Sequence, residues 1–311
     1  MRGVREETMA FEYVLALHPM SNEMLKVQIS DGSSTVLVSD LDSGPDGICV
    51  DPTRTYVYWT NMGKPRLPDR RPPTSDADLD FYRQNGSLER AGLDGSGRTE
   101  ILPEGSFVTG KQLAGAWGRE RLYWSDREGA AVRSARVDGT DMRDEVVVAT
   151  TAVGRRDLLN QCVGVAVDEV NGYLYWTQKG PPKGGMGRIF RTPLDGVPGS
   201  RVIEVLWSNL PEPIDLEIDV VDGLLYWTDR GAPPLGNTLN RAEIPAAGKP
   251  GGDITVVSQG YREAIGLAVD KGAGVAYVGD LSGAIRAVKL DGTGEHVIFT
   301  APGFLTGIAG V

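Results

Sequence analysis

Cysteine is scarce in this sequence: Cys49 and Cys162 are the only two among 311 residues. Both lie inside apolar runs typical of strands, and neither belongs to a CxxC or another metal-ligand spacing. We expect two buried thiols that pack in the core rather than a disulfide, which is typical of a reducing, intracellular setting. The pattern predicts a cytoplasmic protein without a metal site.

Positive charge is also in short supply. The chain has 32 basic residues against 42 acidic ones, which gives a formal net charge of −10 and a pI near 4.9. Affinity for nucleic acid depends largely on Lys and Arg contacts with phosphates, so this balance predicts no nucleic-acid partner. The one basic cluster, Arg66 with Arg70 and Arg71, stands among prolines and precedes several aspartates, which favours a solvated loop.

Long hydrophobic runs are missing as well. No segment approaches the roughly 20 apolar residues that cross a bilayer, and residues 1–12 lack the apolar core of a signal peptide. Helical periodicity is not sustained anywhere, whereas 41 glycines and 19 prolines indicate many tight turns. We predict an all-β fold with no membrane partner.

What the sequence does contain is one recurring aromatic motif. Its best copy is Tyr-Trp-Thr-Asp at residues 226–229, and further copies begin at Tyr58, Tyr123, Tyr175 and, in degenerate form, Tyr277. The last four copies follow one another at about 51 residues, a period typical of repeat architectures.

Each motif lies in a unit of about four strands. A small, apolar run ending in Asp51, Asp168 or Asp270 comes first, and the Tyr of the motif stands seven residues later. In one unit Asn171-Gly172, a strong hairpin signal, joins these two strands. A third strand then ends in an Asp-Gly turn, and a β-branched fourth strand follows.

The two chain ends complete a sixth unit. Residues 13–38 read as second, third and fourth strands without a first, and residues 306–310 read as a first strand with nothing after it. Pairing them closes the ring and removes the exposed sheet edges. We therefore predict a single domain over residues 1–311 that is a six-bladed β-propeller of four-stranded antiparallel blades. Its expected blades are 13–40 plus 305–311, 44–106, 109–150, 161–208, 212–258 and 263–300.

These repeats resemble the YWTD six-bladed β-propeller of receptors of the low-density-lipoprotein class, over nearly the whole chain. Asn61 and Gln178 depart from the motif's Asp. The resemblance implies that the loop after each second strand and the loop entering each first strand share one face. The insertion 64–84 and the Gly- and Pro-rich loops 178–187 and 229–237 lengthen that face, which indicates a walled pocket over the central channel, with an ordinary solvated rim as the alternative.

The residues at the mouth of the channel follow from aligning the first strands. Asp46, Lys111, Val163, Ile214, Ile265 and Thr306 align at one position, and at the next position Gln112 and Asp215 replace the glycine of the other blades. A carboxylate, an amine, an amide and a hydroxyl backed by aliphatic residues suit proton transfer on a largely apolar small molecule. The alternative is that Asp46 and Lys111 form a partly buried structural ion pair.

Further candidates come from the rim. His18 occupies the Thr position of the degenerate N-terminal motif, where it could act as a general acid or base or bond to the rim backbone. His296 is expected at the surface. Side chains in or next to rim loops that could hold an apolar ligand are Met20, Phe107, Gln161, Trp207, Tyr261 and Phe304, together with Thr306. The motif tryptophans, in contrast, are expected between blades because they recur with the fold.

No GxSxG, HExxH, P-loop or dinucleotide motif is present in its structural context, so we expect no cofactor. A single propeller with an elaborated rim resembles the propeller enzymes of fungal natural-product pathways that act as dehydrating hetero-Diels–Alderases. That resemblance implies a pericyclase and dehydratase acting on small apolar substrates such as a terpene and a quinone-methide precursor. The alternatives are a non-catalytic propeller that binds a protein or peptide, and a metal-dependent lactonase-like hydrolase.

Overall fold

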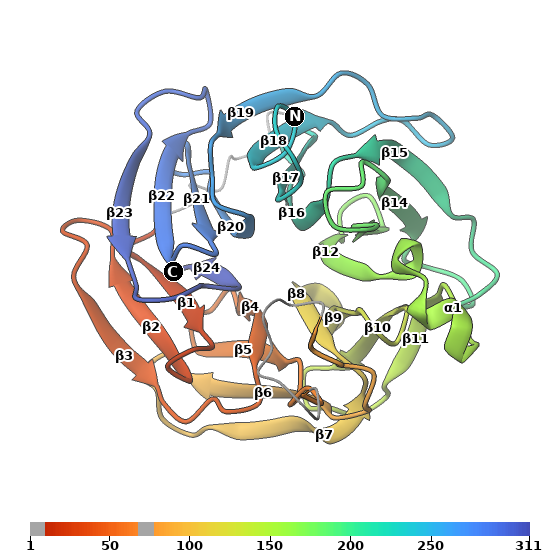
Figure 1. Ribbon diagram of the computed structural model, residues 1–311, viewed down its shortest axis with the longest axis horizontal. Coiled ribbons are helices and arrows are strands. Elements are labelled where there is room, and N and C mark those ends of the chain that lie inside the picture. Colours follow the sequence, from red (N-terminus) through yellow and green to blue (C-terminus); the bar gives the residue numbers. More distant parts are fainter. Residues whose placement is uncertain (1–9, 68–77) are drawn as a thin grey trace.

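Six four-stranded antiparallel sheets surround a central axis in the computed structural model, which describes residues 10–67 and 78–311 (Figure 1). The predicted six-bladed propeller is therefore confirmed. The first three sheets, from inner to outer strand, are β24 (Ile308–Gly310), β1 (Tyr13–His18), β2 (Glu23–Gln28) and β3 (Ser34–Val38); β4 (Pro45–Val50), β5 (Tyr56–Asn61), β6 (Gly86–Gly92) and β7 (Thr99–Phe107); and β8 (Gly110–Ala116), β9 (Arg121–Asp126), β10 (Ala131–Arg136) and β11 (Arg143–Val147).

The other three blades follow the same order. They are β12 (Cys162–Asp168), β13 (Tyr173–Gln178), β14 (Gly187–Pro193) and β15 (Glu204–Leu210); β16 (Pro213–Asp219), β17 (Leu224–Asp229), β18 (Thr238–Glu243) and β19 (Thr255–Gln259); and β20 (Ala264–Asp270), β21 (Val275–Asp280), β22 (Ala284–Lys289) and β23 (His296–Thr300). A short helix, α1 (Ala152–Arg156), precedes β12.

The ring closes where the two chain ends meet. β24 pairs with β1 in antiparallel register, with Val14 opposite Gly310 and Ala16 opposite Ile308. The backbone N–H of Glu12 donates to the carbonyl of Val311 at 2.7 Å and extends the pairing. The predicted joint blade is thus confirmed, although its first strand is only three residues long.

The motif tryptophan joins each blade to the one before it. Trp227 of β17 packs against the preceding blade, with its ring 5.5 Å from that of Trp207 in β15. Trp124 of β9 packs in the same way against Phe107, which ends β7, at 5.1 Å. Trp59, Trp124, Trp176 and Trp227 are all at most 1% exposed. Their predicted place between blades is confirmed. The motif recurs once per blade because each of these contacts between blades uses one wide ring.

The motif threonine ties neighbouring blades at the level of the inner strands. The hydroxyl of Thr60 accepts from the backbone N–H of Gly47 in its own blade and donates to the carbonyl of Lys111 in the next. A Cβ on Gly47 would lie 2.3 Å from that carbonyl oxygen, so only glycine fits. Thr177 and Thr228 repeat the arrangement, which explains why most blades keep glycine after the first-strand start.

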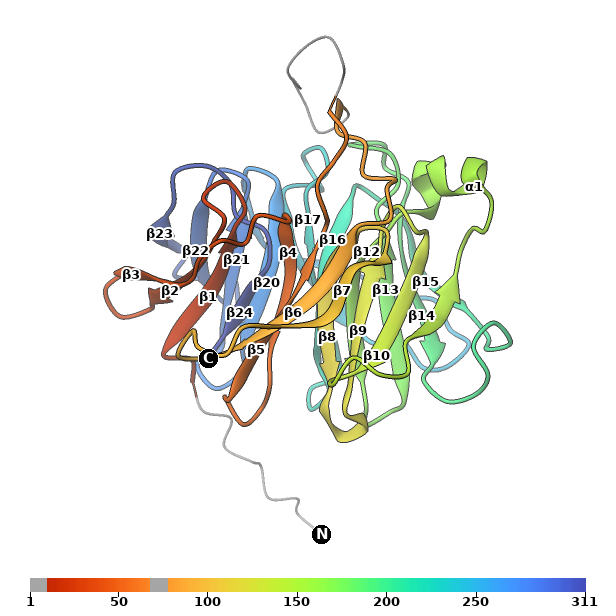
Figure 2. The same cartoon turned by 90° about the horizontal axis from the view of Figure 1, so that it is seen from below.

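The acidic end of the motif fixes the loop that enters each first strand. Asp126 accepts from the backbone N–H of Thr109 at 2.7 Å, and Asp229 accepts from that of Glu212 at 3.0 Å. These loops share a face with the long segment that follows β5, whose described part rises above the ring (Figure 2). We call the face with that segment the upper face. Arg70 and Arg71 of the predicted basic cluster lie outside the described residues.

Candidate functional site

A cavity of about 160 Å³, which we call the upper chamber, occupies the mouth of the channel on the upper face. All six residues that the sequence aligns at the first-strand starts line it, together with Gln112 and Phe304. They converge because each inner strand begins at the same height in a closed ring. The ring residues are Asp46, Lys111, Val163, Ile214, Ile265 and Thr306.

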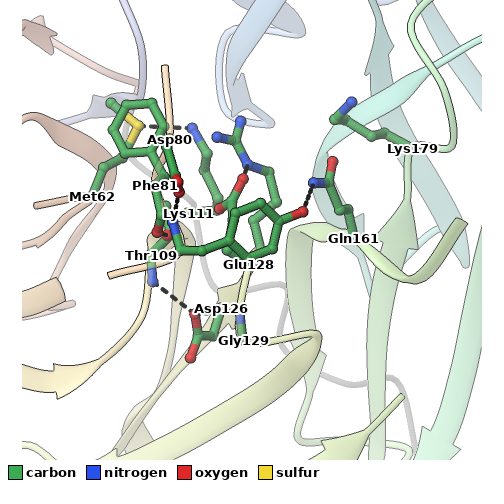
Figure 3. A network of polar contacts seen from close by, with 12 residues as sticks. Met62, Asp80, Phe81, Thr109, Lys111, Asp126, Glu128, Gly129, Gln161 and Lys179 are labelled. Atoms are coloured by element: carbon green, nitrogen blue, oxygen red, sulfur yellow. Dashed lines mark hydrogen bonds and ion pairs between the residues drawn. The ribbon is translucent and has the colours of Figure 1, made fainter. Parts of the chain in front are cut away.

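The polar centre of this ring is the pair formed by Asp46 and Lys111. The ammonium Nζ of Lys111 lies 2.7 Å from Oδ2 of Asp46 and 2.9 Å from the sulfur of Met62 (Figure 3). Both side chains are at most 9% exposed. Burial lowers the pKa of Lys111 against the opposing effect of the Asp46 carboxylate, so its proton is released more readily than that of a solvated lysine.

Sequence reasoning missed a second ring of lining residues. In five blades the residue directly after the motif faces the upper chamber: Met62, Arg127, Lys179, Arg230 and Leu281. Each stands where a second strand ends at the upper face, just past the side chain that anchors the loop. The sequence could have revealed these residues, because each directly follows a copy of the motif and three of the five are basic.

These basic residues are held by buried carboxylates behind the chamber wall. Arg127 Nε lies 2.6 Å from Oε1 of Glu128, and Arg230 Nε lies 2.8 Å from Oε1 of Glu212. Lys179 is only 4% exposed, and its Nζ lies 3.5 Å from that same Glu212 oxygen. Burial and, next, the charge of Arg230 lower the pKa of Lys179 to about 8.

The described ends of the long insertion cover the chamber. Arg66 and Asp80 bond to each other through their backbones, and the carbonyl of Phe81 accepts from the Thr109 hydroxyl at 2.9 Å. Leu79 and Phe81 line the chamber. The neighbouring Tyr82 donates its hydroxyl to the carbonyl of Arg155 in α1, at 3.3 Å. The insertion therefore forms an apolar wall over the site.

A second cavity of about 370 Å³, the lower chamber, fills the channel toward the opposite face. Gln112 lines both chambers, whereas Asp215 lines only the lower one. The Asp215 carboxylate accepts from the backbone N–H groups of Leu216 and, in the next blade, Leu267. Burial raises its pKa well above the usual range, and burial also raises the pKa of nearby Glu217 to about 7. The expected place of Asp215 beside Lys111 is therefore corrected: it lies deeper and joins two blades.

Three predicted pocket walls lie elsewhere. Phe107 and Trp207 are buried against Trp124 and Trp227, and Trp207 also donates to the carbonyl of Gly252 at 3.0 Å. Tyr261 is 3% exposed in the core between the last two blades. Phe107 ends β7 and Tyr261 follows β19, whereas Trp207 lies in the middle of β15. All three rings lie in the interblade layer, where they bury more apolar area.

The remaining rim candidates surround the chamber without lining it. His18 is 4% exposed, and its ring bonds to the carbonyl of Pro302 at 2.8 Å and to the hydroxyl of Ser21, the structural arrangement that the sequence left open. Met20 is 64% exposed. Gln161 donates to the Tyr82 hydroxyl at 3.5 Å beside the chamber wall. His296 is exposed, as predicted.

Neither thiol is paired: Cys162 is buried and Cys49 is half-buried beside the lower chamber. Within residues 10–67 and 78–311, no three His, Cys, Asp or Glu side chains gather as a metal-ion site would require. None of the helices in the described part of the chain has the length and apolar character needed to cross a membrane.

A ring of six blades tied by Tyr-Trp-Thr-Asp repeats, with a walled chamber over its axis, places the chain among the six-bladed β-propellers. It belongs to the family of a Pyricularia oryzae protein named low-density lipoprotein receptor-related protein 1, with 44% identity over 292 residues, or 90% of this chain and 89% of the relative. A Cochliobolus heterostrophus protein named 3-hydroxyacyl-CoA dehydrogenase-like protein LAM1 is 33% identical over 280 residues, and the match spans 56% of that protein. No protein-family model matches the chain.

Solved structures agree on the fold. A chain of the nidogen/laminin complex superposes with a TM-score of 0.71 at 18% identity, covering 96% of this chain and 97% of the other. A gluconolactonase from Xanthomonas campestris superposes with a TM-score of 0.59 at 15% identity, covering 98% and 91%. At such low identity these likenesses describe the architecture alone.

Proposed function

We propose that this protein is a small-molecule biosynthetic enzyme that binds a largely apolar substrate in the upper chamber. One observation carries the proposal: a buried amine–carboxylate pair, Lys111 with Asp46, faces a small cavity whose other walls are mostly aliphatic and aromatic. Such a site excludes water and holds an acid and a base side by side. The apolar wall includes Leu79, Phe81, Val163, Ile214, Ile265, Leu281 and Phe304.

The finer proposal is dehydration of an ortho-hydroxybenzylic alcohol followed by a hetero-Diels–Alder reaction. The Lys111 ammonium protonates the leaving hydroxyl, the benzylic C–O bond breaks, and water departs. Asp46 accepts the phenolic proton, which leaves a neutral quinone methide, and returns that proton to Lys111 across 2.7 Å. The exocyclic carbon and the carbonyl oxygen then each form one bond to an alkene, with no further proton transfer.

Two physical effects support this assignment. Burial weakens the hold of Lys111 on its proton, which improves it as an acid near neutral pH. The chamber also confines both reactants, and confinement of this kind can lower a barrier by several kcal/mol. A quinone methide reacts readily with water, so the apolar cover formed by Leu79 and Phe81 protects the intermediate.

The test uses 2-(hydroxymethyl)phenol with limonene as the alkene, and the cycloadduct is resolved by chiral chromatography. We expect product above the buffer rate with an excess of one stereoisomer. Lys111→Met and Asp46→Asn should reduce the rate at least tenfold, while Lys183→Met, on an exposed residue of a rim loop, should not. A racemic product formed at the buffer rate would overturn the finer proposal.

A non-catalytic propeller that binds a protein is the second candidate, because the relative with 44% identity bears a receptor-related name. The two candidates differ in which surface is used. An interaction propeller requires exposed rim residues such as Met20 and Leu67, whereas the enzyme requires the buried pair. Turnover that depends on Lys111 but not on Met20→Ser favours the enzyme.

A further inference from the structure

The upper chamber gathers positive charge in a protein whose formal net charge is −10. Four basic residues line it: Lys111, Arg127, Lys179 and Arg230. Among the described residues that line it, Asp46 alone is acidic. Three of the four cations follow the aromatic motif in consecutive blades, at the ends of β9, β13 and β17, so they form an arc on one side of the chamber.

Among the described residues, three buried carboxylates pair with the four cations of the chamber. Lys111 pairs with Asp46 at 2.7 Å, Arg127 with Glu128 at 2.6 Å, and Arg230 with Glu212 at 2.8 Å. Lys179 remains, and in the described part of the chain it has no carboxylate of its own. The Glu212 oxygen 3.5 Å from its Nζ already accepts from Arg230, and the other oxygen accepts from the backbone N–H of Lys183.

The hydrogen bonds of Lys179 are similarly incomplete. An ammonium has three N–H donors, and Nζ makes one bond to the carbonyl of Gly180 at 3.2 Å besides the long contact with Glu212. At 4% exposure the group is largely withdrawn from water. A buried ammonium without its own counter-ion is costly, and an anion that entered the chamber would remove that cost.

Gln112, which lines both chambers, carries a second unsatisfied donor. It is 3% exposed, and among the described residues its Nε2 has no hydrogen-bond partner. An amide N–H requires an acceptor, as does the free N–H of Lys179. The chamber therefore combines an apolar wall with donors that lack acceptors.

We propose that the ligand of the upper chamber is an apolar ring system bearing a carboxylate, which binds as the anion to Lys179. The proposal rests on the proposed function insofar as both place the ligand in this chamber, and it adds the charge of that ligand. Arg230 and Arg127 support the anion through their charge, while Leu79, Phe81 and Phe304 contact the ring.

The test compares two probes of the same shape, 2-naphthoate and neutral 2-naphthamide, by equilibrium dialysis at pH 7. We expect naphthoate to bind at least tenfold more tightly. Lys179→Met should abolish the difference, Lys179→Arg should retain most of it, and Lys183→Met, whose side chain is 56% exposed on the same loop, should leave it unchanged. Lys179→Met is expected to fold, because it removes a buried charge.

A pH series on the unaltered protein keeps the proposal testable without any variant. Between pH 7 and 9.5 Lys179 loses its proton, and the charged groups that act on it are Arg230, Glu212 and Arg127. The preference for naphthoate should fall across this range. Lys111 faces the same chamber and its pKa is also lowered, so the series is repeated on Lys179→Arg, which should keep its preference across the range.

The outcomes separate the two proposals. Equal affinity for the two probes overturns the assignment of an anionic ligand, and a preference that persists in Lys179→Met overturns Lys179 as the residue that binds the anion. Both outcomes leave the proposed enzyme untouched. Failure of both probes to bind overturns both. Charge-dependent binding together with a racemic product at the buffer rate supports the anion site and counts against the pericyclase.

Discussion

The two chambers of the channel are built from the same inner strands and carry opposite chemistry. Around the upper chamber, basic residues gather at strand ends beneath an apolar cover. In the lower chamber, Asp215 and Glu217 face the axis, and Lys271 is the basic residue that lines it. The repeat determines which positions of each blade face the channel, and the residues that differ between blades at these positions determine the charge of each chamber. Charged groups are buried at both levels, but the upper pair, Lys111 with Asp46, is close and buried, whereas Lys271 of the lower chamber lies 3.6 Å from Asp219 and is partly exposed.

The largest expected effect comes from breaking the upper ion pair. Lys111→Met leaves the Asp46 carboxylate buried without a partner and should lower the free energy of unfolding by about 3 kcal/mol. The double variant Asp46→Asn with Lys111→Met should recover most of that loss. Urea unfolding measures both.

The matched control is in the lower chamber. Lys271 contacts Asp219 at 3.6 Å with 28% of its side chain exposed, so Lys271→Met should cost less than about 1 kcal/mol. Equal losses for the two Lys→Met variants would remove the energetic distinction between the chambers.

A smaller effect is expected where the lower chamber joins two blades. Asp215→Ala removes the acceptor of the Leu267 backbone N–H and should cost about 2 kcal/mol. Asp215→Asn keeps one side-chain oxygen and should cost less. Urea unfolding gives the totals, and faster hydrogen exchange of the Leu267 amide locates the loss. An unchanged exchange rate would mean that Asp215 does not hold this joint.

The pH dependence of stability sharpens the contrast further. The pKa of Glu217 is about 7 in the folded protein, against 4.5 for an ordinary glutamate. The folded state therefore keeps a proton that the unfolded chain releases. The stability that this proton contributes is complete below pH 4.5 and is lost as the pH rises through 7. Glu217→Gln should nearly match the unaltered protein near pH 4.5 and be more stable by roughly 3 kcal/mol at pH 8.5, because each pH unit between the two pKa values costs about 1.4 kcal/mol. A constant difference across that range would contradict the raised pKa.

The smallest effect concerns the cover. Tyr82→Phe removes the hydroxyl that contacts Arg155 and Gln161, and it should change global stability by less than about 0.5 kcal/mol. Hydrogen exchange over residues 78–85 should nevertheless become faster, because these segments open locally. A Phe variant with unchanged exchange would show that the cover is held by Phe81 and Thr109 instead.

The fold could be predicted from the sequence because the residues of the repeated motif are the ones that pack one blade against the next. Trp227 recurs where one blade meets the next, and the ring at Asp46 and Lys111 followed from counting along equivalent strands. The direction of the wide rings could not be found by such counting: Tyr261 lies in the loop after β19 and Trp207 within β15, and both rings are buried in the core. How deep in the channel the Asp215 side chain lies also depends on its distance from the neighbouring strand, which cannot be predicted from the sequence.

The residue after each motif has a consequence for how such a site can change. Met62, Arg127, Lys179, Arg230 and Leu281 each enter the cavity from a different blade, and none of them holds a blade to its neighbour through the motif contacts. A substitution at one of these positions changes the part of the cavity wall that its blade contributes, while the fold is retained. Relatives with the same architecture could therefore acquire different ligands through changes at these positions, although Lys179 and Arg230 would change together because both contact Glu212.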